Sequence, residues 1–222
     1  MFDFDKSTGE IMIYDEITKA GRGGVDSGTV IKAIKAIGKQ PITIRINSPG
    51  GDVDEGIAIA NALARHPEPV ITINDAIAAS IANYIYMAGT SRLVAKNARA
   101  MIHEPWTMTA GTADELRQTA ILLDEANAVL HSVYAEKLKA SKAEVSAMMK
   151  AETWFNSNQQ MDNGMATGYS NDQSVEPVKI AASMFRNTPP DLIHKLSAGE
   201  KTPYYPKLKK LQHLTRTLEA LR

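Results

Sequence analysis

Residues Pro41–Asn74, PITIRINSPGGDVDEGIAIANALARHPEPVITIN, contain one strand–helix–strand unit that indicates the fold class. Pro41–Asn47 is rich in β-branched residues and predicts a buried strand, which ends at the turn SPGGD. A helix is expected from about Val53 to Arg65, and Pro69–Asn74 predicts a second strand. Because strand, helix and strand at this spacing form a βαβ crossover, the chain is expected to be an α/β protein with a parallel sheet.

The same alternation continues on both sides of that unit. Upstream, Ile11–Tyr14 predicts a short strand, and Asp26 or Ser27 can cap a helix that reaches Ile37. Downstream, NDAIAASIANYIYMAG (Asn74–Gly89) is interpreted as the next helix, and RLVAK and ARAMIH predict two further short strands. The pattern extends the parallel sheet over the first half of the chain.

Helix starts in the second half are marked by capping boxes. Thr112 and Glu115 have the required spacing and open a long helix that runs through about Leu138. The same spacing recurs at SKAE (Ser141–Glu144) and at SNQQ (Ser157–Gln160), which predicts two shorter helices.

Composition excludes several classes of function. The 222 residues are 44% hydrophobic and 23% charged, with 25 acidic and 25 basic side chains, so no strong net charge points to nucleic acid. The absence of cysteine excludes disulfides, thiol catalysis and cysteine-based metal sites, and no cofactor or metal is expected. The start MFDFDKSTGE does not resemble a signal peptide, and no apolar run reaches the ~18 residues of a membrane span, so a cytoplasmic protein is expected.

The character of the sequence changes beyond about Met184. Prolines punctuate this part, and its last 22 residues carry six Lys or Arg against one Glu. We therefore divide the chain into a domain of residues 1–183 and a basic extension of residues 184–222. A leucine stripe in the extension predicts packing on its own domain or on a sister subunit, or docking to a partner protein; it comprises Leu208, Leu211, Leu214, Leu218 and Leu221.

Two stretches carry residues suited to acyl-transfer chemistry. Gly50-Gly51 follows a buried strand, so its unhindered N–H groups can hold an oxyanion, although such glycines also serve purely steric purposes. Ser80 follows the next strand and His103 ends another, the places where catalytic groups collect in parallel sheets. Ser80 is not in a G-x-S-x-G elbow, and taken alone it could be a packing serine in an alanine-rich helix.

The order and spacing of three motifs are more specific than each motif. INSPGGDVDEGIAIANAL, DAIAASIANYIYMAG and MIHEP together resemble the proteolytic subunit of Clp proteases and its phage and prophage relatives, over roughly residues 9 to 172. The resemblance implies the spiral of βαβ units shared with crotonases, with the helix of about residues 112–139 as a protruding handle.

The resemblance also implies a serine endopeptidase. Ser80 would be the nucleophile and His103 the general base, with the backbone N–H groups of Gly51 and Ile81 as the oxyanion hole. An edge strand and the turn at residues 110–112 would hold an extended peptide.

The third member of the triad is where this sequence departs from the family. Two residues before Phe155, where the family has an aspartate, stands Thr153, and its neighbour Glu152 is the rival; Asp162 and Asp172 lie further on. A threonine could orient the imidazole without supplying charge, which would give a weaker base.

The resemblance implies a homo-oligomeric ring that acts on peptide or protein substrates. Only about ten residues precede Ile11–Tyr14, so the usual contact with an ATP-driven unfoldase is not expected. A phage-type role, such as processing during head maturation, is the substrate class that the resemblance suggests; no nucleic-acid or membrane partner is expected.

Three alternatives use the same sequence differently. A crotonase-type acyl-CoA enzyme would need neither Ser80 nor His103. A Ser–Lys peptidase would use Lys96 as its base in place of His103. An inactive ring-forming scaffold would follow from the loss of the aspartate.

Overall fold

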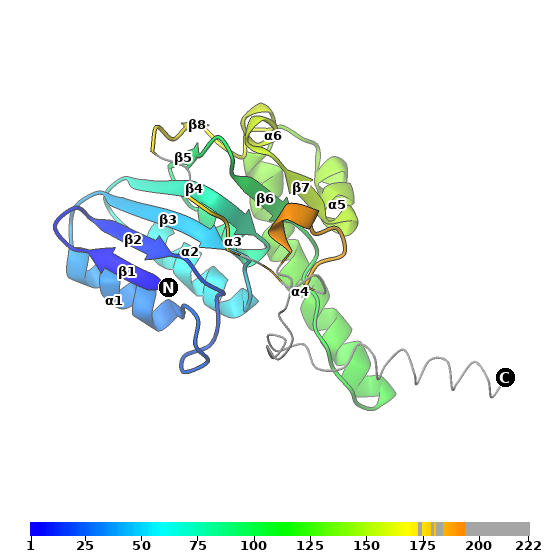
Figure 1. Ribbon diagram of the computed structural model, residues 1–222. Helices are drawn as coiled ribbons and strands as arrows, with labels where there is room; N and C mark the ends of the chain where they lie inside the picture. The colour runs from blue at the N-terminus through cyan, green and yellow to red at the C-terminus, as the bar shows by residue number, and fades with distance from the viewer. Residues whose placement is uncertain (173–174, 179, 181–183, 194–222) are drawn as a thin grey trace, which may run out of the picture. The chain divides into compact units, whose positions relative to one another are not determined.

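The computed structural model describes residues 1–172, 175–178, 180 and 184–193 (Figure 1). The chain separates into two compact units, residues 1–178 and residues 179–222. In the second unit the described structure is a 3₁₀ helix, Pro190–Leu192, and a parallel bridge between Ile180 and Ile193. The leucine stripe lies outside the described residues, and the division at residues 183/184 stays a prediction.

The first unit is built on a mixed sheet that confirms the α/β prediction. Its central strands β2 to β5 are parallel neighbours in the order β1-β2-β3-β4-β5-β8, while β6 pairs with β4 and with β7. The described strands are β1 (Phe2–Asp5), β2 (Glu10–Ile13), β3 (Ile42–Ser48), β4 (Val70–Ala79), β5 (Ser91–Val94), β6 (Arg99–Ile102), β7 (Thr153–Phe155) and β8 (Gly168–Tyr169).

Six α-helices accompany the sheet in the described residues. They are α1 (Ser27–Ile37), α2 (Val53–Ala64), α3 (Ile81–Met87), α4 (Ala113–Lys137), α5 (Lys142–Ala151) and α6 (Ser157–Asp162). Figure 1 shows α1 and α2 together on one face of the sheet and α4 extending away from it, as a handle. No helix among the described residues is both long and apolar enough to cross a membrane.

The predicted helix starts can be compared with the caps. Thr112 and Ser141 each form the predicted capping box, with Glu115 and Glu144. The third box was predicted one residue too late: Asn156 caps α6 with Gln159. The hydroxyl of Ser157 instead donates to the Lys96 carbonyl at 2.6 Å.

Strand β3 shows how the two faces of the sheet differ. Ile42, Ile44 and Ile46 are fully buried, whereas Arg45 and Asn47 alternate with them and point to the opposite face. That alternation separates an aliphatic core from a polar face on the same strand.

The interpretation of Asn74–Ala79 as helix was wrong, because β4 continues through Ala79. Its first half pairs with β5, and Ile77–Ala79 pairs with β6 after a register shift opposite Ile46 and Ser48. Alanine favours helix locally, but here small side chains fit a strand buried on both sides. Tertiary pairing thus overrides local propensity.

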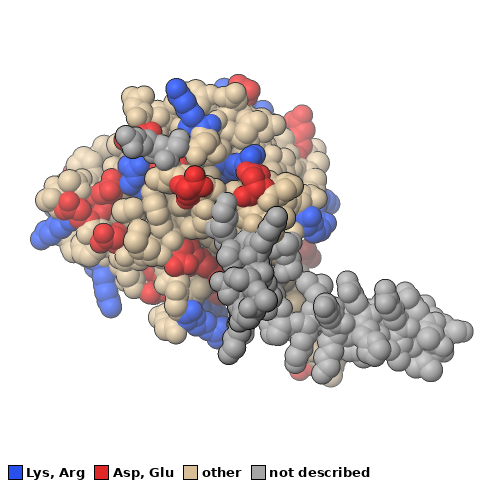
Figure 2. Space-filling view, in the orientation of Figure 1, with Lys and Arg blue, Asp and Glu red and all other residues tan. Residues whose placement is uncertain are grey.

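The surface agrees with the balanced composition. On the face drawn in Figure 2, acidic and basic side chains are both spread over the described residues, and neither forms a single continuous field. This arrangement gives no electrostatic footprint for nucleic acid on that face.

Candidate active site

Ser80 occupies a strained turn between β4 and α3. It caps α3 with φ 55° and ψ −130°, a positive φ that non-glycine residues rarely adopt. The turn is fixed by backbone bonds: the Ser80 N–H donates to the Met101 carbonyl at 3.0 Å, and the Asn83 N–H donates to the Ser80 carbonyl at 2.9 Å. The strain therefore sits at the residue expected to be the nucleophile, as is common at functional sites.

His103 follows β6 and faces that serine. Ala79 pairs with Met101 in the parallel β4/β6 ladder, so the two strand ends bring the residues that follow them together. The Ser80 Oγ lies 2.8 Å from the His103 Nε2, and the imidazole is 9% exposed. This is the distance required for proton transfer from a hydroxyl to a general base.

The double-glycine turn packs directly against the nucleophile. Gly50 has φ 94°, and a Cβ there would lie 2.7 Å from the Ala79 carbonyl oxygen and 2.7 Å from the Ser80 Cβ. Gly51 has φ 142°, and a Cβ there would overlap the Ile17 carbonyl oxygen. Both glycines are therefore required by close backbone approach, which also makes room beside Ser80.

Ile17 holds this turn in place, and sequence reasoning missed it. Its N–H donates to the Gly50 carbonyl at 2.8 Å, and its carbonyl accepts from the Asp52 N–H at 2.8 Å. Within the described part of the chain, the N–H groups of Gly51 and Ile81 have no hydrogen-bond acceptor. No local signal in the sequence marks Ile17, because the contact joins segments more than 30 residues apart.

The candidates for the third group lie on a turn beside β6. Thr153 opens β7 opposite Ile102, the residue before His103, and its hydroxyl donates to the Met148 carbonyl at 2.7 Å. Glu152 is 4% exposed and has φ 54°. Asp172 is directed elsewhere, because it accepts a hydrogen bond from Arg45 at 2.9 Å.

Metal-ligating side chains do not gather at this site. Among the described residues, no group of three or more His, Asp or Glu side chains could hold a metal ion. The two side chains in contact can pass a proton between a hydroxyl and an imidazole.

Comparisons with known proteins agree with this geometry. A sequence model described as "Clp protease" matches residues 7–169. ATP-dependent Clp protease proteolytic subunit 1 of Leifsonia xyli subsp. xyli is 30% identical over 128 residues, which cover 57% of this chain and 65% of that protein. Subunit 3 of Streptomyces coelicolor is 30% identical over 65% of this chain and 67% of that protein. Subunit 2 of Treponema pallidum is 26% identical over 78% and 87%.

Proposed function

Because the chain belongs to the Clp protease family, we propose that it is a serine endopeptidase that cleaves peptide bonds through an acyl-enzyme on Ser80. The observation that carries the proposal is the 2.8 Å contact between the Ser80 Oγ and the His103 Nε2. Its support from the relatives is their description as proteolytic subunits.

The reaction follows from the two side chains. His103 accepts the hydroxyl proton as Ser80 Oγ attacks the substrate carbonyl, and the imidazolium then donates that proton to the leaving amine as the C–N bond breaks. A water molecule deprotonated by the same imidazole hydrolyses the ester and restores the serine. The N–H groups of Gly51 and Ile81 would stabilise the oxyanion in both steps.

Thr153 is our proposal for the group that orients His103. It lies on the strand paired with β6, and a hydroxyl that donates to Met148 can still accept an imidazole N–H. Glu152 is the second candidate, because it precedes Thr153 in the chain and its own buried carboxylate could supply charge. Thr153→Val and Glu152→Gln distinguish them: the variant of the orienting residue loses most of its acylation rate.

Assembly into a homo-oligomeric ring is part of the proposal. Four large apolar side chains on α4 are between 43% and 64% exposed, namely Leu116, Ile121, Leu122 and Val129. Exposed apolar side chains of this size favour association. Light scattering of the protein and of Leu122→Asp tests it, since a monomer in both would contradict the ring.

We also propose that the enzyme processes phage-type protein substrates without an unfoldase. The residues just ahead of β2 pair with it as β1, and so are part of the sheet. Cleavage of a folded head-protein precursor in the absence of ATP is the expected result. Cleavage that requires an added ATPase would contradict this proposal.

The decisive experiment is active-site labelling. A fluorophosphonate probe should label Ser80, located by mass spectrometry, and Ser80→Ala and His103→Ala should abolish labelling. Lys96→Ala is the matched control, because a Ser–Lys peptidase would lose labelling in that variant and keep it in His103→Ala. A folded wild-type protein that is not labelled would be an inactive scaffold, and protection by coenzyme A would indicate an acyl-CoA enzyme.

A further inference from the structure

A strap of residues 170–172 and 175–178 crosses the polar face of the sheet. It starts at β5, where the Ser170 N–H donates to the Val94 carbonyl at 2.9 Å. Asp172 then reaches Arg45 on β3, so the strap passes over β4, as Figure 1 shows. Beyond Ser170 the described hydrogen bonds that hold it to the sheet come from side chains of the sheet and its loops.

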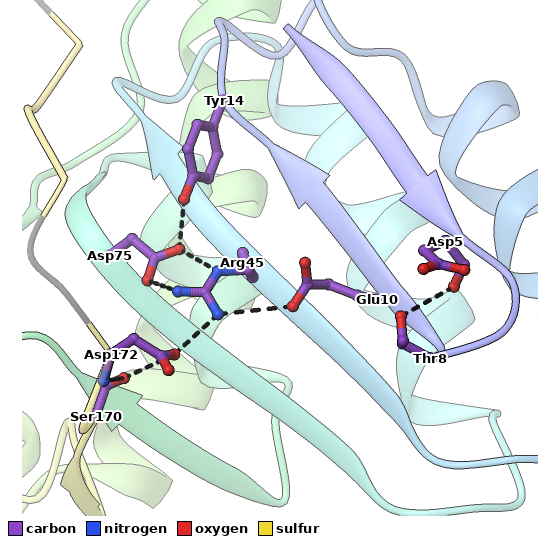
Figure 3. Close-up of polar contacts among 8 residues, drawn as sticks. All are labelled: Asp5, Thr8, Glu10, Tyr14, Arg45, Asp75, Ser170 and Asp172. Carbon is purple, nitrogen blue, oxygen red and sulfur yellow. Dashed lines mark hydrogen bonds and ion pairs between the residues drawn. The ribbon is translucent and has the colours of Figure 1, made fainter.

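The first anchor is a polar cluster around Arg45 (Figure 3). Arg45 forms a fork with Asp75 through Nε at 2.9 Å and Nη2 at 2.7 Å, and Tyr14 donates to Asp75 at 2.6 Å. Its Nη1 holds Asp172 at 2.9 Å and lies 3.6 Å from Glu10. Because Asp75 and Glu10 would remain if Asp172 left, Arg45 does not depend on the strap.

The second anchor is Asn47, whose described side-chain hydrogen bonds both go to the strap. Its Nδ2 donates to the Glu176 carbonyl at 2.9 Å, and its Oδ1 accepts from the Val178 N–H at 3.0 Å. The side chain is almost fully buried, and both of its polar ends are used on the strap. An amide that binds a carbonyl and an N–H two residues apart selects an extended backbone at that place.

Asn47 also lies at the point where the pairing of β3 with its neighbouring strands is interrupted. The parallel register with β2 ends at Ile46, and the register with β4 shifts between Ile46 and Ser48. Asn47 is therefore the residue of β3 without a Cα partner on either neighbouring strand. At this position, the hydrogen bonds from the Asn47 side chain to the strap take the place of backbone pairing with a neighbouring strand.

The oxyanion turn, residues Ser48–Asp52, begins immediately after this point. The Ser48 Oγ accepts the Gly50 N–H at 3.2 Å, so the path of the chain at Ser48 fixes the first half of the turn. Ile17 fixes the second half through Asp52. A displacement of the backbone at Asn47 would therefore move Ser48 and, through the hydrogen bond between Ser48 and Gly50, the N–H of Gly51.

We propose that the strap positions the oxyanion turn, with Asn47 as the positioning residue that couples residues 176–178 to the N–H of Gly51. The inference rests on the proposed function for its catalytic meaning, but the coupling itself is a physical property of the chain. Docking of the strap holds the donor where the oxyanion forms, and loss of docking leaves the turn mobile.

The test compares three variants of the full chain. Asn47→Ala removes both bonds to the strap, and Val178→Pro removes one N–H donor without altering Asn47. Asn97→Ala is the matched control, because Asn97 also binds the strap, at the Val175 carbonyl and 3.4 Å, but is not part of β3. Amide hydrogen exchange of residues 48–52, kcat, KM and fluorophosphonate labelling are measured for each.

In Asn47→Ala, exchange of the Gly50 and Asp52 amides should become about tenfold faster, because local opening is easier. Its kcat should fall about tenfold with KM within twofold, less than the ~10²–10³ expected for deleting an oxyanion donor. Val178→Pro should follow in the same direction, and Asn97→Ala should match wild type.

Two results separate this inference from the proposed function. Unchanged exchange of residues 48–52 in both Asn47→Ala and Val178→Pro overturns the coupling, whatever the activity. Faster exchange in a protein whose Ser80 is never labelled supports the coupling and rejects the protease proposal.

Discussion

Strands β3 and β4 carry two polar centres that are built in opposite ways. At their carboxyl ends, the candidate active site uses a positive φ at Ser80, two close-packed glycines and N–H groups without acceptors in the described structure. On their polar face, the Arg45–Asp75 cluster is an ordinary network of satisfied side chains. Of these two centres, it is the candidate active site that holds the strained φ and the unmet N–H donors, where a substrate would complete them.

The electrostatics of the polar cluster follow from burial and pairing. Burial and the Asp75 carboxylate raise the pKa of Tyr14 to about 12. Burial opposes the charge of Arg45, but Asp75 holds its pKa above the ordinary value. Burial also raises the pKa of Asp75, although the hydrogen bond from Tyr14 and the charge of Arg45 oppose this shift. Pairing therefore favours a charged Arg45 and a neutral Tyr14, as suits a structural element.

Replacing Ser80 gives the largest expected effect and separates strain from chemistry. Ser80→Gly should lose at least about 10⁴ in kcat/KM, because the nucleophile is gone. The same change should raise the free energy of unfolding by about 1 kcal/mol, because glycine adopts φ 55° without strain. Activity assays and urea denaturation measure the two.

Ser132→Gly is the control for that variant, since Ser132 is exposed within α4 and glycine there should reduce stability. If Ser80→Gly also proved less stable than wild type, the active-site turn would not be strained and the contrast with the polar cluster would be lost.

Gly50→Ala should affect both activity and stability. Its Cβ would lie 2.7 Å from the Ala79 carbonyl oxygen and the Ser80 Cβ, at a φ of 94°. We expect kcat to fall about 10³-fold as the turn moves away from Ser80, with a loss of about 3 kcal/mol in the free energy of unfolding. Gly21→Ala is the matched control, because Gly21 has φ 80° and a Cβ added there would have no atom within 4 Å. Equal losses of stability in both variants would mean that backbone strain, and not the close contact with Ser80, is the cause.

Asp75→Asn tests the other centre, where stability should change without chemistry. The substitution removes the negative charge that pairs with Arg45. The free energy of unfolding should therefore fall by about 3 kcal/mol, and Tm should fall by about 6–12 °C. The rate of Ser80 labelling per folded molecule should stay unchanged. Asp114→Asn, which breaks the exposed pair with Arg117, should leave Tm where it is; a change in labelling rate only in Asp75→Asn would mean that the two centres are coupled.

The same contrast explains what could be predicted from the sequence. Ser80, His103 and Gly50-Gly51 are predicted as site residues because each belongs to a short motif at a strand end, and their order along the chain is specific. The structure brings Ser80 and His103 within hydrogen-bond distance, and their catalytic roles stay a prediction. The long helix α4 was predicted from its capping box, Thr112 and Glu115. These signals are local, so one sequence suffices to find them.

Features that depend on distant partners were not predicted. Arg45 reaches Asp172 across 127 positions, and Asn47 reaches Val178 across 131. No periodicity or motif records such pairs. The extension of β4 through Ala79 was missed for the same reason, because its pairing with β6 outweighs the helix preference of its alanines.

Asp172 should give the smallest effect, because it is the exposed member of the cluster, with half of its side chain accessible. Hydrogen bonds from Arg45 and Ser170 hold the pKa of Asp172 below its ordinary value. A carboxyl whose pKa is lowered by folding stabilises the protein above its unfolded pKa, ~3.9, and loses that contribution as the pH falls through the folded value.

Asp172→Asn should therefore be less stable than wild type at pH 7 by under about 1 kcal/mol, since solvent screens the pair. The difference should shrink as the pH falls below the unfolded pKa of ~3.9 and through the lower folded pKa, where wild-type Asp172 becomes protonated and resembles the amide. Urea denaturation of both proteins between pH 3 and 7, with Asp124→Asn on α4 as the control, measures it. If the difference in the free energy of unfolding stayed the same at pH 3, Asp172 would hold the strap by its shape and its bond to Ser170. The charge of Arg45 would then stabilise Asp75 and not Asp172.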